Sequence, residues 1–187
     1  GLSDKGNAVT PDAEDNVIAA GQVYTANDDY FLVKYNASPK LTEVSPIYIG
    51  ETSNVTFKGY GLISGSSVTF ADPAISTGAI TVLSGQITLS VSPAQSVLLG
   101  ATTVTITAPN GESVSDYSLG RTYLRTTVAA GASASISAMT RAGQALLTIP
   151  SATFPGQQVI VTLYTVAADA SGRQIGEAVY LGVSPAG

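Results

Sequence analysis

The chain has 187 residues, 44% of them hydrophobic and only 11% charged, and its formal net charge is −5. It contains no Cys, His or Trp, which excludes a disulfide framework, a catalytic thiol, a thiolate metal site, and the Ser–His–Asp and Cys–His catalytic arrangements. The few Lys and Arg residues are scattered singly, so we expect neither a nucleic-acid partner nor binding to an anionic membrane.

Enzyme chemistry is restricted further, because the sequence has no glycine-rich phosphate-binding loop followed by a helix. Catalysis by carboxylates alone, or by Ser and Lys, is the chemistry that the composition leaves open. The first 20 residues lack the basic start and apolar stretch of a signal peptide, and no segment approaches the length of a transmembrane helix. We therefore expect a non-catalytic protein with no cofactor and no membrane partner.

Residues 1–40 differ in character from the rest of the chain, being acidic and poorly periodic. Two apolar runs, 17–24 and 30–35, flank a polar turn at 27–29 and predict a hairpin or an extended arm that ends near Pro39. A largely polar segment cannot offset its own ordering entropy by burial, so we predict that 1–40 attaches the chain to neighbouring subunits. The alternative is that the second run completes the chain's own domain.

The apolar runs of this segment supply candidate interface residues. Tyrosines bring apolar area and a hydroxyl to a contact at low entropy cost, although they also pack at the edges of sandwiches. An extended apolar run can add a strand to a neighbour's sheet or dock in a groove between subunits. The candidate interface residues are Tyr24, Tyr30, Phe31, Leu32, Val33 and Tyr35.

The same segment holds the densest carboxylates, which are the candidate metal ligands of this chain: Asp12, Glu14, Asp15, Asp28 and Asp29. Calcium requires several oxygen ligands that converge from one loop, and the first cluster lacks the glycine and the terminal Glu of an EF-hand. We predict that both clusters are solvated acidic turns, with calcium binding as the less favoured alternative.

From Leu41 onward the pattern becomes regular, with apolar and polar residues in alternation and frequent turn residues, as is typical of a β-sandwich. No segment keeps a helical apolar period. The predicted strands lie at 41–44, 53–60, 67–70, 79–83, 86–91 and 103–107. The predicted core residues, on the apolar sides of these strands, are Val55, Phe57, Val68, Phe70, Ile87, Leu89, Val104 and Ile106.

Turn residues give this block a recognisable order: a serine-proline start at 44–46, a strand that ends in the glycine-containing turn 57–62, the strands 67–70 and 86–89, and a last strand 103–107 that leads into Pro109-Asn110-Gly111. In these features residues 41–117 resemble the IPT/TIG immunoglobulin-like domain family. The block departs from the family where 47–50 replace the glycine pair that usually follows the serine-proline. The resemblance implies an immunoglobulin-like sandwich and says little about function.

The C-terminal block repeats this organisation, because the sequence of 143–150 is similar to that of 85–93 and the sequence of 158–164 is similar to that of 102–106. We predict strands near 121–128, 133–139, 144–149, 158–167 and 175–183. The sequence thus predicts an all-β chain with two small immunoglobulin-like sandwiches, 41–117 and 118–187, preceded by the arm 1–40. The alternative is one larger barrel, completed around the first domain by the arm and the C-terminal block.

Three classes of function are compatible with this organisation. The first hypothesis is a virion structural protein, a capsid decoration (head outer) protein of a tailed phage or else a tail component. It would lie at the virion surface, bound to capsid or other virion subunits and self-associated or held in the assembly. The second is a bacterial cell-surface or secreted adhesion module, where IPT/TIG domains also occur. The third, a carbohydrate-binding accessory domain, is disfavoured because such domains usually expose Trp.

Overall fold

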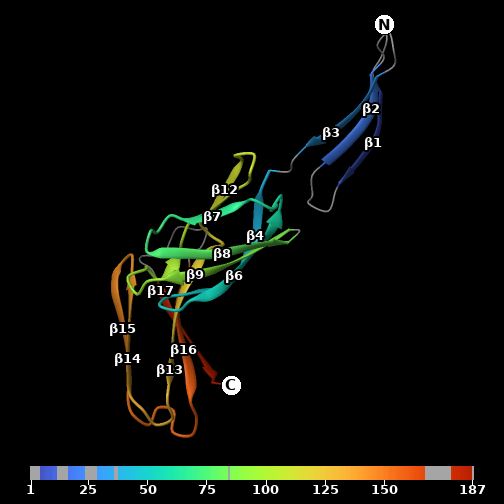
Figure 1. Cartoon of the computed structure of the whole chain (residues 1–187). Coiled ribbons are helices and arrows are strands. Elements are labelled where there is room, and N and C mark those ends of the chain that lie inside the picture. The colour runs from blue at the N-terminus through green and yellow to red at the C-terminus, as the bar shows by residue number, and fades with distance from the viewer. Residues whose placement is uncertain are drawn as a thin grey trace.

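A computed structural model describes residues 5–11, 17–23, 29–35, 38–83, 85–166 and 178–186. Within these ranges every helix-or-strand element is a strand, which confirms the predicted all-β class (Figure 1). The same ranges therefore include no helix long and apolar enough to cross a membrane.

The N-terminal sheet consists of three antiparallel strands in the order β1-β2-β3. They are β1 (Lys5–Pro11), β2 (Val17–Val23) and β3 (Asp29–Tyr35). β2 and β3 pair as a hairpin, which was one of the two alternatives predicted for this segment, whereas β1, whose polar composition gives no strand signal, was not predicted. Figure 1 shows this sheet at one end of the molecule, apart from the other sheets.

Seven strands within residues 40–116 form two antiparallel sheets. One has the order β4-β6-β9-β8 and consists of β4 (Lys40–Val44), β6 (Ser53–Tyr60), β9 (Gln86–Pro93) and β8 (Ile75–Leu83). The other has the order β12-β11-β7 and consists of β12 (Ser113–Asp116), β11 (Val104–Thr107) and β7 (Ser67–Phe70). Numbered along the chain, these seven strands have the ABED and CFG order of a constant-type immunoglobulin sandwich.

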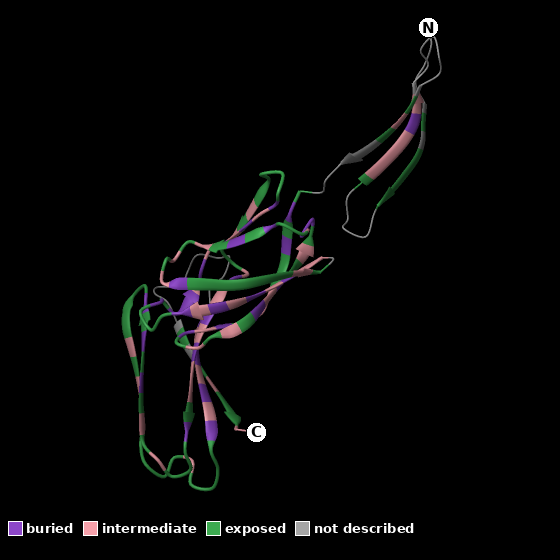
Figure 2. Cartoon of the chain, viewed as in Figure 1, coloured by how far each residue is buried: buried purple, intermediate pink, exposed green. Residues whose placement is uncertain are grey.

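The core of this sandwich contains the residues that alternation predicts. Val55, Phe57 and Ile87 are completely buried, as are both predicted residues of β11. Phe70 is only partly buried and packs against the core, with its ring centroid 6.3 Å from that of Phe57. Figure 2 shows buried residues along these strands, whereas the described part of the N-terminal sheet is almost entirely exposed or intermediate.

The C-terminal block has three long antiparallel strands, β13 (Arg121–Val128), β16 (Val159–Val166) and β17 (Ala178–Pro185), and the hairpin of β14 (Ala134–Thr140) and β15 (Gly143–Ile149). All five lie within a few residues of their predicted positions. The edge of the β13 sheet is completed by two short strands from the first block, β5 (Ile47–Tyr48) and β10 (Gly100–Ala101).

The two blocks are therefore joined and not merely linked in series. Buried side chains from both belong to one hydrophobic cluster, which extends from Leu41 to Leu163. The division at 117/118 into two domains stays a prediction, since a shared sheet and a shared core do not mark a boundary there.

A tight turn makes the chain connection at this point. Asp116 Oδ1 accepts hydrogen bonds from Ser118 N–H at 2.7 Å, Ser118 Oγ at 2.9 Å and Leu119 N–H at 2.8 Å. Burial by itself would raise the pKa of Asp116, but the bonds from Leu119 and Ser118 outweigh it and hold this pKa below its ordinary value. The turn directs the chain from β12 into β13.

Candidate functional site

The N-terminal sheet carries apolar side chains on both of its faces. The antiparallel register sets Val9 opposite Ala19 and Phe31 opposite Gly21, so that these side chains share a face with Val17. The opposite face carries Ile18, Ala20, Tyr30 and Leu32. Tyr30 is 79% exposed and Leu32 is 74% exposed, and Val9 and Val17 are exposed on the other side.

Strands that are apolar on both faces are typical of sheets covered from both sides. Three short strands without a second layer leave this apolar surface in water, and exposed apolar surface of this kind marks interaction sites. The outer edges of β1 and β3 also pair with no described strand, so they offer backbone donors and acceptors to another chain. These features make the sheet a candidate protein-binding surface.

The predicted interface residues have different outcomes. Tyr30, Phe31 and Leu32 all lie in β3, with Phe31 on the face opposite to the other two. Val33 and Tyr35 belong to the same strand, but their side chains lie outside the described residues, as does Tyr24 altogether.

The predicted acidic turns fall almost wholly outside the described residues. This applies to Asp12, Glu14, Asp15 and Asp28, and to the side chain of Asp29, whose backbone begins β3. In the part of the chain that is described, no three His, Cys, Asp or Glu side chains are grouped so that they could hold a metal ion. Neither the solvated-turn prediction nor the calcium alternative is tested.

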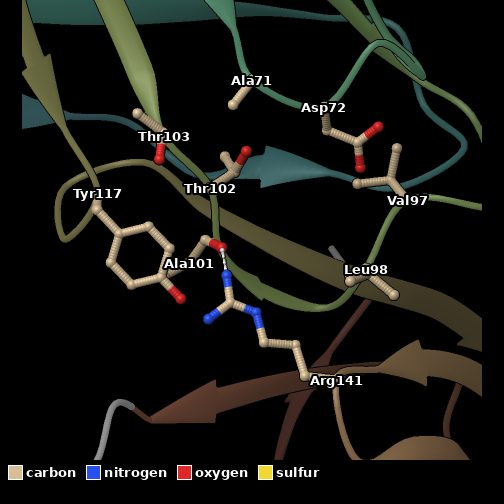
Figure 3. Close-up of a pocket in the computed structure, with 9 residues that line it drawn as sticks. All are labelled: Ala71, Asp72, Val97, Leu98, Ala101, Thr102, Thr103, Tyr117 and Arg141. Atoms are coloured by element: carbon tan, nitrogen blue, oxygen red, sulfur yellow. Dashed lines mark hydrogen bonds between the residues drawn. The ribbon is translucent and has the colours of Figure 1, made fainter.

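A pocket of about 220 Å³ with a mixed polar and apolar lining lies where the turn between β14 and β15 meets the first block (Figure 3). The Arg141 guanidinium lies 4.8 Å from the centre of the Tyr117 ring, and its Nη2 donates to the Ala101 carbonyl over 3.4 Å. Asp72 forms another part of the wall, and its Oδ1 accepts a hydrogen bond from Ala74 N–H at 2.9 Å. Thr102 and Thr103 add hydroxyls.

The geometry of this pocket follows from the way β10 is held. Thr122 Oγ1 is buried, accepts from Gly100 N–H at 2.9 Å and donates to the Leu98 carbonyl at 2.6 Å. The wall of the pocket offers one cation, one carboxylate, one phenol and two hydroxyls, which are groups that can contact a polar ligand.

A second cluster lies on the sheet that joins the two blocks. The rings of Tyr48, Tyr123 and Tyr164 follow one another across β5, β13 and β16, with centroid distances of 6.1 Å at both steps. Arg125 lies over the Tyr48 ring at 3.9 Å, and its Nε donates to both carboxylate oxygens of Glu51 at 2.8 and 2.9 Å. The hydrogen bond to Glu51 is the main cause that raises the pKa of Arg125. The cluster fixes the first block to the second.

Sequence reasoning missed both clusters. Arg125 and Glu51 are 74 positions apart, and only the pairing of β5 with β13 brings them together. Arg141 likewise reaches Tyr117 only because the β14–β15 turn contacts the first block. Neither arrangement has a local pattern that could have indicated it.

An apolar groove of about 220 Å³ lies between β15 and the strands β16 and β17. It is lined only by alanine, leucine and valine: Ala145, Leu146, Leu147, Leu163, Val179 and Leu181. Both β15 and β17 are edge strands among the described elements. The groove is the second apolar surface that the described chain leaves open.

No protein-family model matches the chain, and no curated protein matches its sequence. Among solved structures, the chain is similar to a structural genomics protein of unknown function from Bacteroides thetaiotaomicron VPI-5482. The TM-score is 0.36 with 12% sequence identity, over 78% of this chain and 46% of the other. The chain thus spans less than half the length of that protein, and a likeness at this level carries no argument about function.

Proposed function

We propose that this chain is a non-catalytic structural subunit of a larger assembly, in which the β1–β3 sheet is covered by neighbouring subunits. The observation that carries the proposal is the exposure of apolar side chains on both faces of that sheet, with Tyr30 and Leu32 on one face and Val9 and Val17 on the other. Burial of this surface in an interface would provide the hydrophobic stabilisation that the isolated sheet lacks.

The position of the sheet supports the same role. Among the residues that the structure describes, the buried cluster of the sandwich begins at Leu41 and includes none from β1, β2 or β3. The sheet can therefore be covered by a partner without any change in the packing of the sandwich. This is the relation expected between an attachment element and the body that it attaches.

We further propose that the assembly is a virion and that the chain lies on its exterior as a capsid decoration protein. A role as a tail component is an alternative within the same proposal. The support is the sequence: a low charged fraction, no cysteine, and an acidic N-terminal segment ahead of a block that resembles IPT/TIG domains. The alternative is a bacterial surface or secreted adhesion module. Immunogold labelling with an antibody against the chain separates them, because the first setting places the label on phage particles and the second on cells.

A truncated chain that begins at Ser38 tests the attachment role. We expect it to unfold cooperatively with the stability of the full chain, because every residue of the sandwich core is retained. We also expect it to lose self-association and binding to the parent particle or cell. If the truncated protein unfolds or aggregates as a monomer instead, the N-terminal sheet belongs to the fold of the sandwich and the proposal is wrong.

A further inference from the structure

The inner face of the C-terminal sheet is covered by the β14–β15 hairpin over β16 but is left open over the edge strand β17. In the register of β16 and β17, Val161 is opposite Val183 and Leu163 is opposite Leu181. The two β16 residues are buried in the core that includes Ile136 and Ile149 of the β14–β15 hairpin. Their β17 partners are not covered, since Leu181 is 51% exposed and Val183 is 48% exposed.

The cause is the number of strands in each layer. Three long strands, β13, β16 and β17, pack against a layer in which the structure describes two strands, β14 and β15. The groove lies beside β15 and over β17, which is where a third strand of the smaller layer would lie. Its apolar lining matches a strand that places aliphatic or aromatic side chains toward it.

The N-terminal sheet of the same protein has a strand of this kind. β3 is an edge strand and presents Tyr30 and Leu32 on one face, both largely exposed. Figure 1 shows the N-terminal sheet and the C-terminal block at opposite ends of the molecule, so the sheet of one copy meets the groove of another.

Charge favours the same pairing. Residues 1–40 contain six Asp and Glu against three Lys, whereas residues 118–187 contain two Asp and Glu against four Arg. The two ends of the chain therefore carry opposite net charge, which favours their encounter and disfavours contact between like ends. The acidic residues of 1–40 other than Asp29 fall outside the three strands, so this charge complementarity concerns the two ends of the chain, whereas the contacting strand and groove are matched by their apolar side chains.

We propose that copies of this chain associate head to tail, with β3 of one copy docked in the groove between β15 and β17 of the next. The inference rests on the proposed function and names its partner, a second copy of this chain. Because the two contacting surfaces differ, the interface is heterologous and builds a ring or an open filament, depending on the rotation between neighbours.

Two single variants test the interface, one on each side: Leu32→Asp on β3 and Leu181→Asp in the groove. Sedimentation of the full chain over a range of concentrations should show assembly of the wild type. Each variant should associate more than tenfold more weakly, because a carboxylate enters an apolar contact. An equimolar mixture should form a dimer and stop there, since Leu32→Asp retains an intact groove and Leu181→Asp retains an intact sheet.

The controls separate this interface from a loss of folding. Leu83→Asp changes a leucine of β8 that is 65% exposed and lies outside both surfaces, and it should assemble like the wild type. If Leu181→Asp is unstable to heat, Leu146→Asp takes its place as the test of the groove. Leu146 lies on the other wall of the groove, and its replacement by Asp should weaken assembly to the same extent.

The outcomes also separate this inference from the proposed function. A wild type that stays monomeric, a Leu181→Asp variant that assembles normally, or a mixture that stays monomeric overturns the head-to-tail interface. If Leu32→Asp alone prevents assembly, the N-terminal sheet is still the attachment element and only the groove is wrong as its partner. The attachment role itself is contradicted only when the chain that begins at Ser38 assembles and binds like the full chain.

Discussion

Gly59 lies in β6 at a point where the neighbouring backbone leaves no room for a side chain. It pairs with Leu41, next to the irregularity in β4 between Leu41 and Glu43. A Cβ at Gly59 would lie 1.9 Å from the Lys40 carbonyl oxygen and 2.9 Å from its carbon. Because the obstacle is backbone and not a flexible side chain, Gly59→Ala must displace β4 from β6.

The cost of this displacement can be worked from what β4 contributes. Leu41 is 6% exposed, and loss of its burial costs about 1.5–3 kcal/mol. Each hydrogen bond between β4 and β6 that is broken adds about 1 kcal/mol. We therefore expect Gly59→Ala to lower the free energy of unfolding by about 3–5 kcal/mol, as measured by urea denaturation.

Gly182→Ala in β17 is the matched control, because a Cβ there would lie 3.8 Å from the Thr162 carbonyl oxygen, an ordinary contact. We expect this variant to stay within about 1 kcal/mol of the wild type. If Gly59→Ala also stays within about 1 kcal/mol, the close approach of β4 to β6 is wrong.

The remaining predictions concern the core and one turn. Phe57→Ala should cost about 3–5 kcal/mol in denaturant unfolding because its side chain is completely buried, and Phe70→Ala should cost less because it is only partly buried. Equal costs would contradict the difference in packing. Asp116→Asn should destabilise the chain at neutral pH, where the carboxylate accepts the bonds from Ser118 and Leu119. Since the pKa of Asp116 is lowered in the folded state, its stabilisation is present above the unfolded pKa and is lost as the pH falls through the folded pKa. The free energy of unfolding of the wild type should therefore exceed that of Asp116→Asn at pH 7, and this difference should decrease as the pH is lowered. A difference that stays constant with pH would refute this role.

Much of the sandwich could be predicted because its strands alternate with a buried face. Val55 and Phe57, or Val104 and Ile106, are two positions apart, and this spacing alone places both on one side of a strand. β12 was missed for the converse reason. It contains one apolar residue, Val114, and pairs only with β11, so that its sequence carries little strand signal.

The candidate surfaces could be predicted only in part. The apolar run of β3 is visible in the sequence, because apolar residues on both faces form a continuous stretch. The groove could not be predicted, because Val179, Leu181 and Val183 would alternate with their neighbours in the same way whether or not another strand covered them. The two-residue strands β5 and β10 are too short for any pattern, and their pairing depends on the tertiary fold.

The shared sheet has a consequence for how such a chain can evolve. β13 is flanked by strands from both blocks, so a genetic exchange at residue 117 would separate it from residues 47–48 and 100–101. A crossover at that position would also separate Arg125 from Glu51, and Tyr123 from Tyr48. Recombination between related genes would therefore preserve the two blocks as one inherited unit. No described residue of the N-terminal sheet belongs to their core, so this sheet could be exchanged without loss of the core.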